Sequence, residues 1–154
     1  MMISNTRDLL LSHNLQSEEE ASHQRKMLSL LAHQAIWSST NFSPGHFTAS
    51  AMVLSPDQRK ALLIYHSGFQ FWIQPGGHID TGDATLLKTA LREVEEECGL
   101  SETQLVLSEE NPALCLTHSL LQLDIHAVPE SKRKKQPAHF HYDLRFVFIS
   151  KTWK

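Results

Sequence analysis

The stretch from Gln74 to Leu100 constrains the fold of this chain more than any other part of it. Its sequence is QPGGHIDTGDATLLKTALREVEEECGL. Apolar residues recur in it at spacings of three and four, which predicts an amphipathic helix of about four turns. Asp83 or Thr81 can cap the start of this helix, and Gly99 can adopt the left-handed conformation that ends it. We therefore expect a loop, a helix and a glycine stop.

Three carboxylates lie on one ridge of the predicted helix. At about 100° per residue, Glu93, Glu96 and Glu97 fall on an arc next to the apolar face. Like charges at this spacing destabilise an isolated helix, so they need either solvent or a bound cation. A solvated acidic face is the default interpretation of such a run. The adjacent Gly76 and Gly77 favour a cation, because glycines let the backbone approach closely and offer a carbonyl ligand.

The order of residues around this helix resembles the Nudix box. The family pattern is Gly, five residues, Glu, seven residues, Arg-Glu-aliphatic-any-Glu-Glu-any-Gly-aliphatic. Its second half matches Arg92 to Leu100 at every specified position. The first half differs twice, because Asp83 replaces the usual Glu and eight residues instead of seven separate it from Arg92. An insertion before the helix is easily absorbed, whereas one inside it would rotate the ligands away.

The resemblance implies a fold, an activity and a set of site residues. The implied fold class is α/β, an α/β/α sandwich of the Nudix type with a mixed sheet. The implied activity is Mg²⁺- or Mn²⁺-dependent hydrolysis of a diphosphate linkage in a small nucleotide derivative. Glu93, Glu96, Glu97 and the carbonyl of Gly76 would hold the metal, and Glu93 or Glu97 would act as the base through a water. Arg92 would orient a carboxylate or hold the loop against the helix.

Composition is that of one soluble domain. The chain has 154 residues, 41% hydrophobic residues and a formal net charge of −3, so a general affinity for nucleic acid is not expected. Its apolar runs are too short for a membrane helix or a signal peptide, which predicts a cytoplasmic protein. Residues 1–45 are expected to be a helical extension and residues 46–154 the Nudix domain. Cys98 and Cys115 are expected to be buried thiols and not a disulfide.

Periodicity predicts the remaining elements. Residues 4–15 and 18–37 are expected to be helices, the second capped by Ser17 with Glu20, with a role in packing or in a homodimer. Strands are expected over 47–54, over 61–66 as a buried strand, over 69–74, and over 105–107. Alternating residues in 121–127 and 140–148 predict two strands that pair as an antiparallel hairpin. Trp72 is expected in the core or as a wall of the cleft. The resemblance also allows it to stack on a base, but core packing is the more frequent fate of such a residue.

The predicted hairpin carries two polar features. Residues 130–137 form a basic loop, either a solvated tip or a segment that meets the phosphates of a substrate or an RNA end. His139, His141 and Asp143 alternate on one side of a strand, and His126 can approach from its partner. This side has three interpretations, which are a polar face in water, a transition-metal site, and a wall of the substrate cleft that also includes His78.

Two departures from the family pattern leave an alternative open. Nudix domains commonly continue past the strand that matches Phe140 to Ile149 with a further strand and a helix, whereas this sequence ends at Lys154. The N-terminal helices or a partner chain would then have to cover the second face of the sheet, or the protein would be poorly active. Together with Asp83, this supports a non-catalytic nucleotide-binding module as the rival function. A metalloprotein that uses His126, His139, His141 and Asp143 is a lesser rival.

Overall fold

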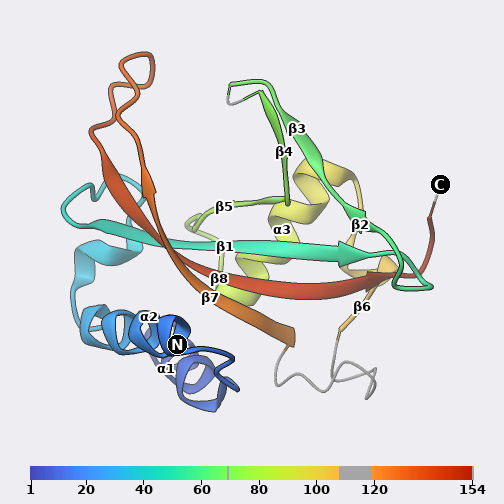
Figure 1. Ribbon diagram of the computed structural model, residues 1–154, viewed down its shortest axis with the longest axis horizontal. Helices are drawn as coiled ribbons and strands as arrows, with labels where there is room; N and C mark the ends of the chain where they lie inside the picture. Colours follow the sequence, from blue (N-terminus) through green and yellow to red (C-terminus); the bar gives the residue numbers. More distant parts are fainter. Residues whose placement is uncertain (69, 108–118, 154) are drawn as a thin grey trace.

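A computed structural model describes residues 1–68, 70–107 and 119–153 (Figure 1). It has a mixed sheet, a long helix in the predicted place and two N-terminal helices, which confirms the mixed α/β fold. The helices are α1 (Met2–Ser12), α2 (Glu18–Leu30) and α3 (Leu86–Cys98), with 3₁₀ turns η1 (Gln34–Trp37) and η2 (Glu102–Gln104). The strands are β1 (Gly45–Leu54), β2 (Ala61–Leu62), β3 (Ile64–His66), β4 (Phe71–Ile73), β5 (Gly76–His78), β6 (Leu105–Val106), β7 (Leu120–Val128) and β8 (His139–Ser150).

Strands β1 and β8 form the centre of the main sheet. They run parallel, with a register from Gly45 opposite Phe140 to Leu54 opposite Ile149. At one end β5 pairs antiparallel with β1 and β7 pairs antiparallel with β8, which confirms the predicted hairpin. At the other end the flanking strands are β2 and β6. The β3–β4 and β7–β8 hairpins rise on the same side of β1 in Figure 1.

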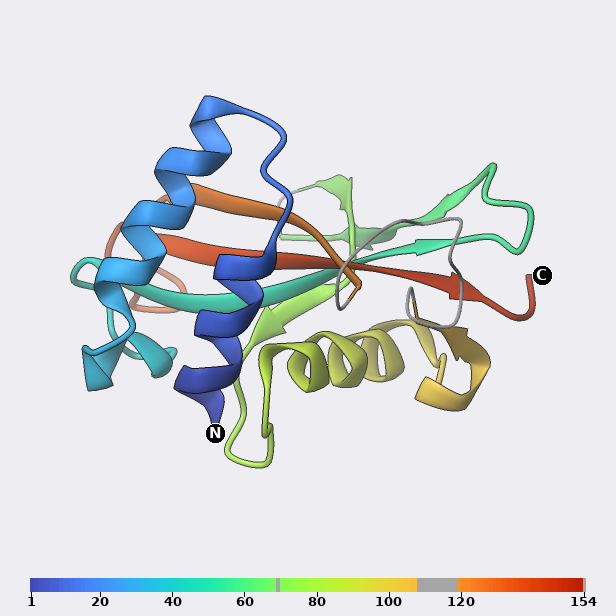
Figure 2. The same ribbon diagram turned by 90° about the horizontal axis from the view of Figure 1, so that it is seen from below.

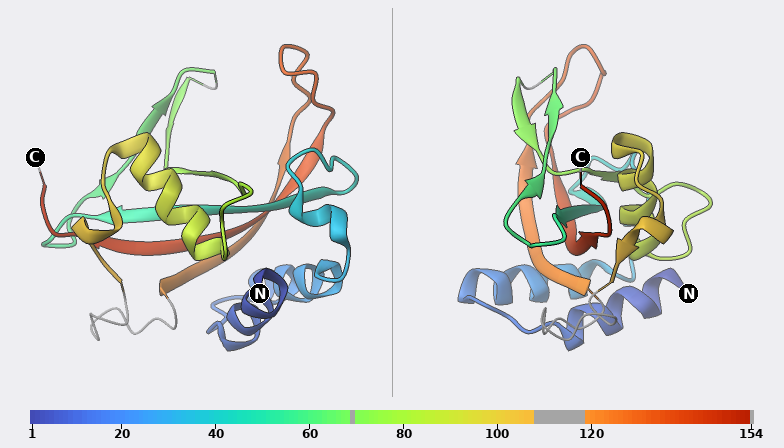
Figure 3. Two further views of the ribbon diagram at one scale, coloured as in Figure 1. Left: turned by 180° about the vertical axis from the view of Figure 1, so that it is seen from behind. Right: turned by 90° about the vertical axis from the view of Figure 1, so that its right-hand side faces the viewer.

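Alternation along the central strands gives this sheet one apolar and one polar face. Phe47 and Ala49 of β1 and Leu144 of β8 are buried in a cluster that also contains apolar residues of α1, α2 and α3. Successive residues of a strand point to opposite faces, so His46 and His141, which are paired in register, lie on the other face. The helices therefore share the apolar side of the sheet, and Figure 3 shows α3 lying across β1 and β8.

Helix α3 begins later than its sequence suggests. Its N-cap is Thr85, whose hydroxyl accepts a hydrogen bond from the Lys88 N–H at 3.2 Å. Neither Asp83 nor Thr81 is the cap, because the Asp83 carboxylate is already engaged by Arg92 and by the Asp80 N–H. The predicted C-terminal stop is confirmed, since Gly99 has a φ of 69°.

Helix α2 has the predicted cap but a different end. The Ser17 hydroxyl accepts from the Glu20 N–H at 3.1 Å, and the helix ends at Leu30, not at residue 37. The chain then turns into η1, which places Trp37 against Phe47 with ring centroids 4.8 Å apart. A continuous helix would lose this contact, so packing on β1 decides the boundary.

Helix α2 also covers the outer edge of β7 (Figure 2). The Leu123 N–H donates to the Glu20 carboxylate at 2.9 Å, and the Leu123 carbonyl lies 3.2 Å from Nδ1 of His23. Glu20 also accepts from the Gln16 N–H at 2.7 Å and contacts Nε2 of His13 at 2.7 Å. These contacts satisfy backbone groups that an exposed edge strand would leave open.

The strands before α3 are shorter and more exposed than expected. Residues 61–66 do not form one buried strand, because β2 pairs with β1 whereas β3 pairs only with β4. Trp72 on β4 is 64% exposed and meets Tyr65 edge to face, so its predicted place in the core is wrong.

Phe69 and Cys115 lie outside the described residues, and Cys98 is a free thiol. Within the described ranges every helix is too short or too polar to traverse a bilayer.

Candidate active site

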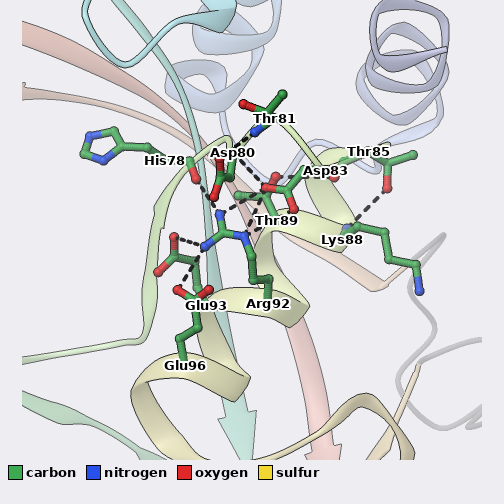
Figure 4. Close-up of polar contacts among 10 residues, drawn as sticks. All are labelled: His78, Asp80, Thr81, Asp83, Thr85, Lys88, Thr89, Arg92, Glu93 and Glu96. Atoms are coloured by element: carbon green, nitrogen blue, oxygen red, sulfur yellow. Dashed lines mark hydrogen bonds and ion pairs between the residues drawn. The ribbon is translucent and has the colours of Figure 1, made fainter.

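Arg92 is the centre of the polar contacts on α3 (Figure 4). Its guanidinium contacts three carboxylates: Nη2 donates to Asp83 at 3.0 Å, and Nη1 donates to Glu93 at 2.9 Å and to Glu96 at 3.1 Å. Nη2 also donates to the backbone carbonyl of His78 at 2.7 Å. The planar, multidentate guanidinium can make all these bonds at once, as a lysine ammonium could not. Arg92 therefore joins the loop, β5 and α3.

Asp83 shows how the inserted residue is accommodated. The loop closes on itself, with the Asp83 N–H donating to the Asp80 carbonyl at 3.0 Å and the Asp80 N–H to the Asp83 carboxylate at 2.9 Å. The carboxylate then reaches Nε and Nη2 of Arg92. The loop before α3 thus accommodates both Asp83, which is shorter than the usual Glu, and the inserted residue. The spacing of Glu93, Glu96 and Glu97 along the helix is therefore unchanged.

Two glycines of β5 bring the backbone against the glutamates. The Gly76 N–H donates to Glu97 at 3.0 Å. A Cβ on Gly77 would lie 2.5 Å from Oε1 of Glu93, so only glycine leaves room for that carboxylate. A Cβ on Gly76 would lie 2.6 Å from Cβ of Ser50 on β1, which is also too close. The glycine pair therefore seats one glutamate and lets β5 approach β1.

Burial and neighbouring charges set the protonation behaviour of this site. Burial raises the pKa of Glu93, and the nearby charges of Glu97 and Glu96 also raise it, against the opposite effect of Arg92. Burial alone would raise the pKa of Asp83, but hydrogen bonds from Arg92 and from the Asp80 backbone lower it overall. The hydrogen bond to Asp83 raises the pKa of Arg92. Arg92 therefore stays positively charged among carboxylates that repel one another.

The carboxylates open onto a cleft of about 460 Å³. It is lined by residues of β5, the following loop and α3, together with one serine before β1: Ser39, Gly76, Gly77, His78, Ile79, Asp80, Arg92, Glu93 and Glu97. The Glu96 side chain is 57% exposed, against 13% for Glu93, and stands beside the cleft on the same helix. The structure thus brings together Gly76, Arg92, Glu93, Glu96 and Glu97 from the sequence analysis.

The predicted histidines lie on the opposite side of β5. The His78 side chain points away from Arg92 although its carbonyl contacts it (Figure 4). His78 is in register with Thr48, and its ring lies 5.0 Å from that of His46 and 5.3 Å from that of His141. His126 and His139 lie 5.3 Å and 5.1 Å from the His141 ring. We call these five residues the histidine cluster.

His46 is the member that sequence reasoning missed. It lies one residue before the predicted strand 47–54 and is not among the predicted site residues. The signal was present, because His46, Thr48 and Ser50 alternate as polar residues along β1. Their partner Asp143 is buried and accepts from Thr48 at 2.8 Å and from Ser50 at 2.5 Å. Asp143 therefore spans two strands of the polar face, and burial raises its pKa.

Burial controls the charge of the histidine cluster. It lowers the pKa of His78 to about 4 and that of His141 to about 3, in both cases helped by neighbouring histidines. It also lowers the pKa of His46. The hydrogen bond that His126 donates to Asp124 has the opposite effect and raises the pKa of His126. These lowered pKa values leave the rings of His46, His78 and His141 neutral at neutral pH, so each has one unprotonated ring nitrogen.

The helix, the loop before it and the mixed sheet define a family. Residues 44–141 match the family model described as NUDIX domain, and the chain belongs to that family. A 48-residue stretch is 44% identical to bis(5'-nucleosyl)-tetraphosphatase [asymmetrical] of Rattus norvegicus and covers 31% of this chain and 32% of that protein. The corresponding protein of Sus scrofa is 42% identical over 48 residues. The match thus spans about a third of the length of these relatives.

Solved structures with a similar arrangement have low sequence identity to this chain. The C. elegans Ap4A hydrolase is 18% identical, with a TM-score of 0.37 over 66% of this chain and 67% of that one. The E. coli dihydroneopterin triphosphate pyrophosphohydrolase is 14% identical, with a TM-score of 0.45 over 70% of each chain. The family membership therefore rests on the match of residues 44–141.

Proposed function

We propose that this protein hydrolyses a diphosphate linkage in a nucleotide derivative, with a divalent metal ion held by Glu93, Glu96 and Glu97. The observation that carries the proposal is the glutamate ridge placed against the glycine pair of β5. One oxygen of Glu97 lies 3.0 Å from the Gly76 N–H, and the Glu93 carboxylate occupies the space that a side chain on Gly77 would take. Both residues line the cleft.

The donor set fits Mg²⁺ or Mn²⁺. Three carboxylates on consecutive turns supply hard oxygen ligands, and the carbonyl of Gly76 is a further oxygen on the neighbouring strand. Burial raises the pKa of Glu93, and the charges of Glu97 and Glu96 raise it further, which a bound cation would offset. When bound, such an ion neutralises phosphate oxygens and lowers the pKa of a coordinated water.

The chain's own residues have separate roles in this proposal. Arg92 fixes the rotamers of Glu93 and Glu96 through Nη1 and holds the preceding loop through Asp83. Glu97 or Glu93 accepts a proton from the attacking water. The cleft between β5 and the loop 79–83 admits the diphosphate group of the substrate. The relatives named above act on bis(5'-nucleosyl) tetraphosphates, which makes dinucleoside polyphosphates the first substrates to test.

The test is a hydrolysis panel with Mg²⁺ present. Dinucleoside polyphosphates, ADP-ribose, coenzyme A and deoxynucleoside triphosphates are compared, and release of phosphate-containing products is measured. Glu97→Gln and Glu96→Gln should lower kcat by about 100-fold or more, because a metal ligand supplies several kcal/mol of transition-state stabilisation. Glu95→Gln makes the same charge change on the exposed side of α3 and should leave kcat unchanged.

Two outcomes would contradict this function. Equal turnover in the parent, Glu96→Gln and Glu97→Gln proteins would remove the catalytic role of the glutamates. Calorimetric binding of a nucleotide without turnover of any substrate in the panel would instead support the non-catalytic binding module.

A further inference from the structure

The histidine cluster contains an unsatisfied buried nitrogen. The His46 side chain is 1% exposed, and its Nδ1 lies 2.9 Å from the backbone carbonyl of Asn41. A carbonyl only accepts, so Nδ1 carries the hydrogen and Nε2 presents a lone pair. That Nε2 has no hydrogen-bond partner among the described residues. Buried polar atoms are almost always paired, so this lone pair is available to a hydrogen-bond donor or to an electron-pair acceptor such as a metal ion.

Two further imidazoles lie close to His46. One ring nitrogen from each of His46, His78 and His141 lies within 4.8 Å of the others. They come from β1, β5 and β8, whose pairing fixes the relative positions of the three residues. Tetrahedral ligands with Zn–N bonds of about 2.0–2.1 Å have their nitrogens about 3.3 Å apart. Rotation of the rings about their side-chain torsions would have to close this difference.

We propose that His46, His78 and His141 form a binding site for a first-row transition metal ion of the Zn²⁺ class. Imidazole nitrogens suit Zn²⁺, whereas Mg²⁺ prefers oxygen ligands. The Nδ1–H to carbonyl bond of His46 is the kind of outer contact that fixes the tautomer of a metal-binding histidine. The site lies on the other face of β5 from the glutamates, so this proposal goes beyond the proposed hydrolase function.

His139 lies beside these three residues. Its Nδ1 lies 2.8 Å from the carbonyl of Pro137, which leaves Nε2 as a lone pair. That Nε2 accepts a hydrogen bond from Nε2 of His141 at 3.3 Å, so a metal ion would require His141 to carry its hydrogen on Nδ1 instead. Either His139 or a water molecule would fill the fourth position.

The same geometry argues against a phosphate ion as the occupant. An anion needs hydrogen-bond donors, whereas Nε2 of His46 and Nε2 of His139 are both held as acceptors by carbonyls at Nδ1. The basic loop contributes Lys134 near His78, and it would favour an anion at the outer rim. The experiment therefore includes inorganic phosphate as a competing probe.

Cobalt(II) titration of the full chain tests the site. After treatment with a chelator and removal of the chelator, one equivalent of Co²⁺ should produce the visible d–d absorption of a four-coordinate ion. One equivalent of Zn²⁺ should remove this absorption, and excess Mg²⁺ or phosphate should leave it unchanged. Zn²⁺ should also raise Tm, because a ligand that binds only the folded state stabilises it.

Variants locate the ion. His78→Asn and His141→Asn should each weaken Co²⁺ binding by at least about 100-fold, since each removes one of three protein ligands. His33→Asn removes an exposed histidine elsewhere and should bind Co²⁺ like the parent. Glu97→Gln should keep the cobalt spectrum although its hydrolytic activity falls. This variant therefore separates the proposed hydrolase site from the proposed histidine site. His46 is buried, so the variant His46→Gln can fail to fold. His78 is exposed, and His78→Asn therefore tests the site in a folded protein.

Three results would overturn the proposal. The first is the absence of a stoichiometric cobalt spectrum in the folded parent protein. The second is an unchanged spectrum in both His78→Asn and His141→Asn. The third is saturable binding of inorganic phosphate that is lost in His141→Asn while Co²⁺ has no effect on Tm.

Discussion

The two faces of β5 differ in chemistry although they share three residues of backbone. On the α3 side, glutamates of one helix lie around the guanidinium of Arg92, which donates hydrogen bonds to four different residues. On the other side, imidazoles from separate strands converge with no described cation among them. The first arrangement depends on local sequence, because consecutive helical turns place the glutamates. The second depends on strand pairing, because residues about 30 to 95 positions apart must meet.

Substitution of Gly76 and Gly77 should have the largest effect on the difference between the two faces of β5. A Cβ at Gly77 would meet only the end of the Glu93 side chain, which can move away. Gly77→Ala should therefore lower kcat about 100-fold, the effect of displacing a catalytic group by about 1 Å, with little change in Tm. Steady-state kinetics and thermal unfolding of the same preparation measure both.

Gly76→Ala is the matched control. Its Cβ would lie 2.7 Å from Cα of Ser50 and 2.8 Å from the carbonyl of Ala49, which are backbone atoms of β1. This variant should lose stability as well as activity and should also weaken Co²⁺ binding, because β5 carries His78. A Gly77→Ala protein that unfolded like Gly76→Ala would contradict the assignment of Gly77 to the seating of Glu93.

Removal of Asp83, which holds Arg92 in place, should lower activity less than the glycine substitutions do. Asp83→Ala breaks the bonds from Asp83 to Arg92 but leaves the glutamates in place. We expect a fall in kcat of about 10- to 100-fold, as for residues that orient metal ligands, with KM nearly unchanged. Asp83→Glu should recover part of this loss because it restores the carboxylate.

Lys88→Ala provides the control for Asp83→Ala. Lys88 on α3 forms an exposed ion pair with Glu102 of η2, at 2.7 Å. Such pairs contribute little, so activity and Tm should stay close to those of the parent. Equal loss of activity in Lys88→Ala and Asp83→Ala would show that any charge change on or near α3 is sufficient.

The third prediction concerns stability alone and should leave both faces functional. Glu20→Gln weakens a buried carboxylate that accepts bonds from His13, Gln16 and Leu123. We expect the free energy of unfolding at pH 7 to fall by about 1–3 kcal/mol. Hydrolysis per folded molecule and Co²⁺ affinity should not change, since α2 contacts neither site.

The pH dependence of this effect has a definite sign. Burial would raise the pKa of Glu20, but its hydrogen bonds lower it below the ordinary value of 4.5. A lowered folded-state pKa contributes stability that is present above 4.5 and is lost as the pH falls through the folded value. Chemical denaturation at pH 7 and pH 3 should therefore show a parent-variant difference that shrinks in acid. A constant difference would contradict the role of the carboxylate charge.

Local patterns predicted the elements that carry their own signals. The 3.6-residue period and Gly99 located α3, Ser17 located the start of α2, and period-two alternation located the β7–β8 hairpin. The interior of β1 was also predictable from its small and β-branched residues. Signals of this kind act over a few residues, so no long-range information is needed to read them.

The errors occur where tertiary contacts compete with local preference. Asp83 is a good N-cap residue, but its bonds to Arg92 leave Thr85 to cap the helix. The apolar run 61–66 suits a buried strand, yet β3 pairs only with β4 and stays at the surface. Trp72 has a core-like side chain, and its place on that hairpin leaves it exposed.

The sequence by itself determined the carboxylate ridge, because the spacing of Glu93, Glu96 and Glu97 fixes their side of a helix before any folding partner is known. Only the tertiary structure decided that Gly76 and Gly77 lie against that ridge and that His46 joins His78 and His141. Those positions follow from the parallel register of β1 with β8 and the pairing of β5 with β1. Strand registers are set by burial across the whole sheet, and therefore no single stretch of the chain encodes them.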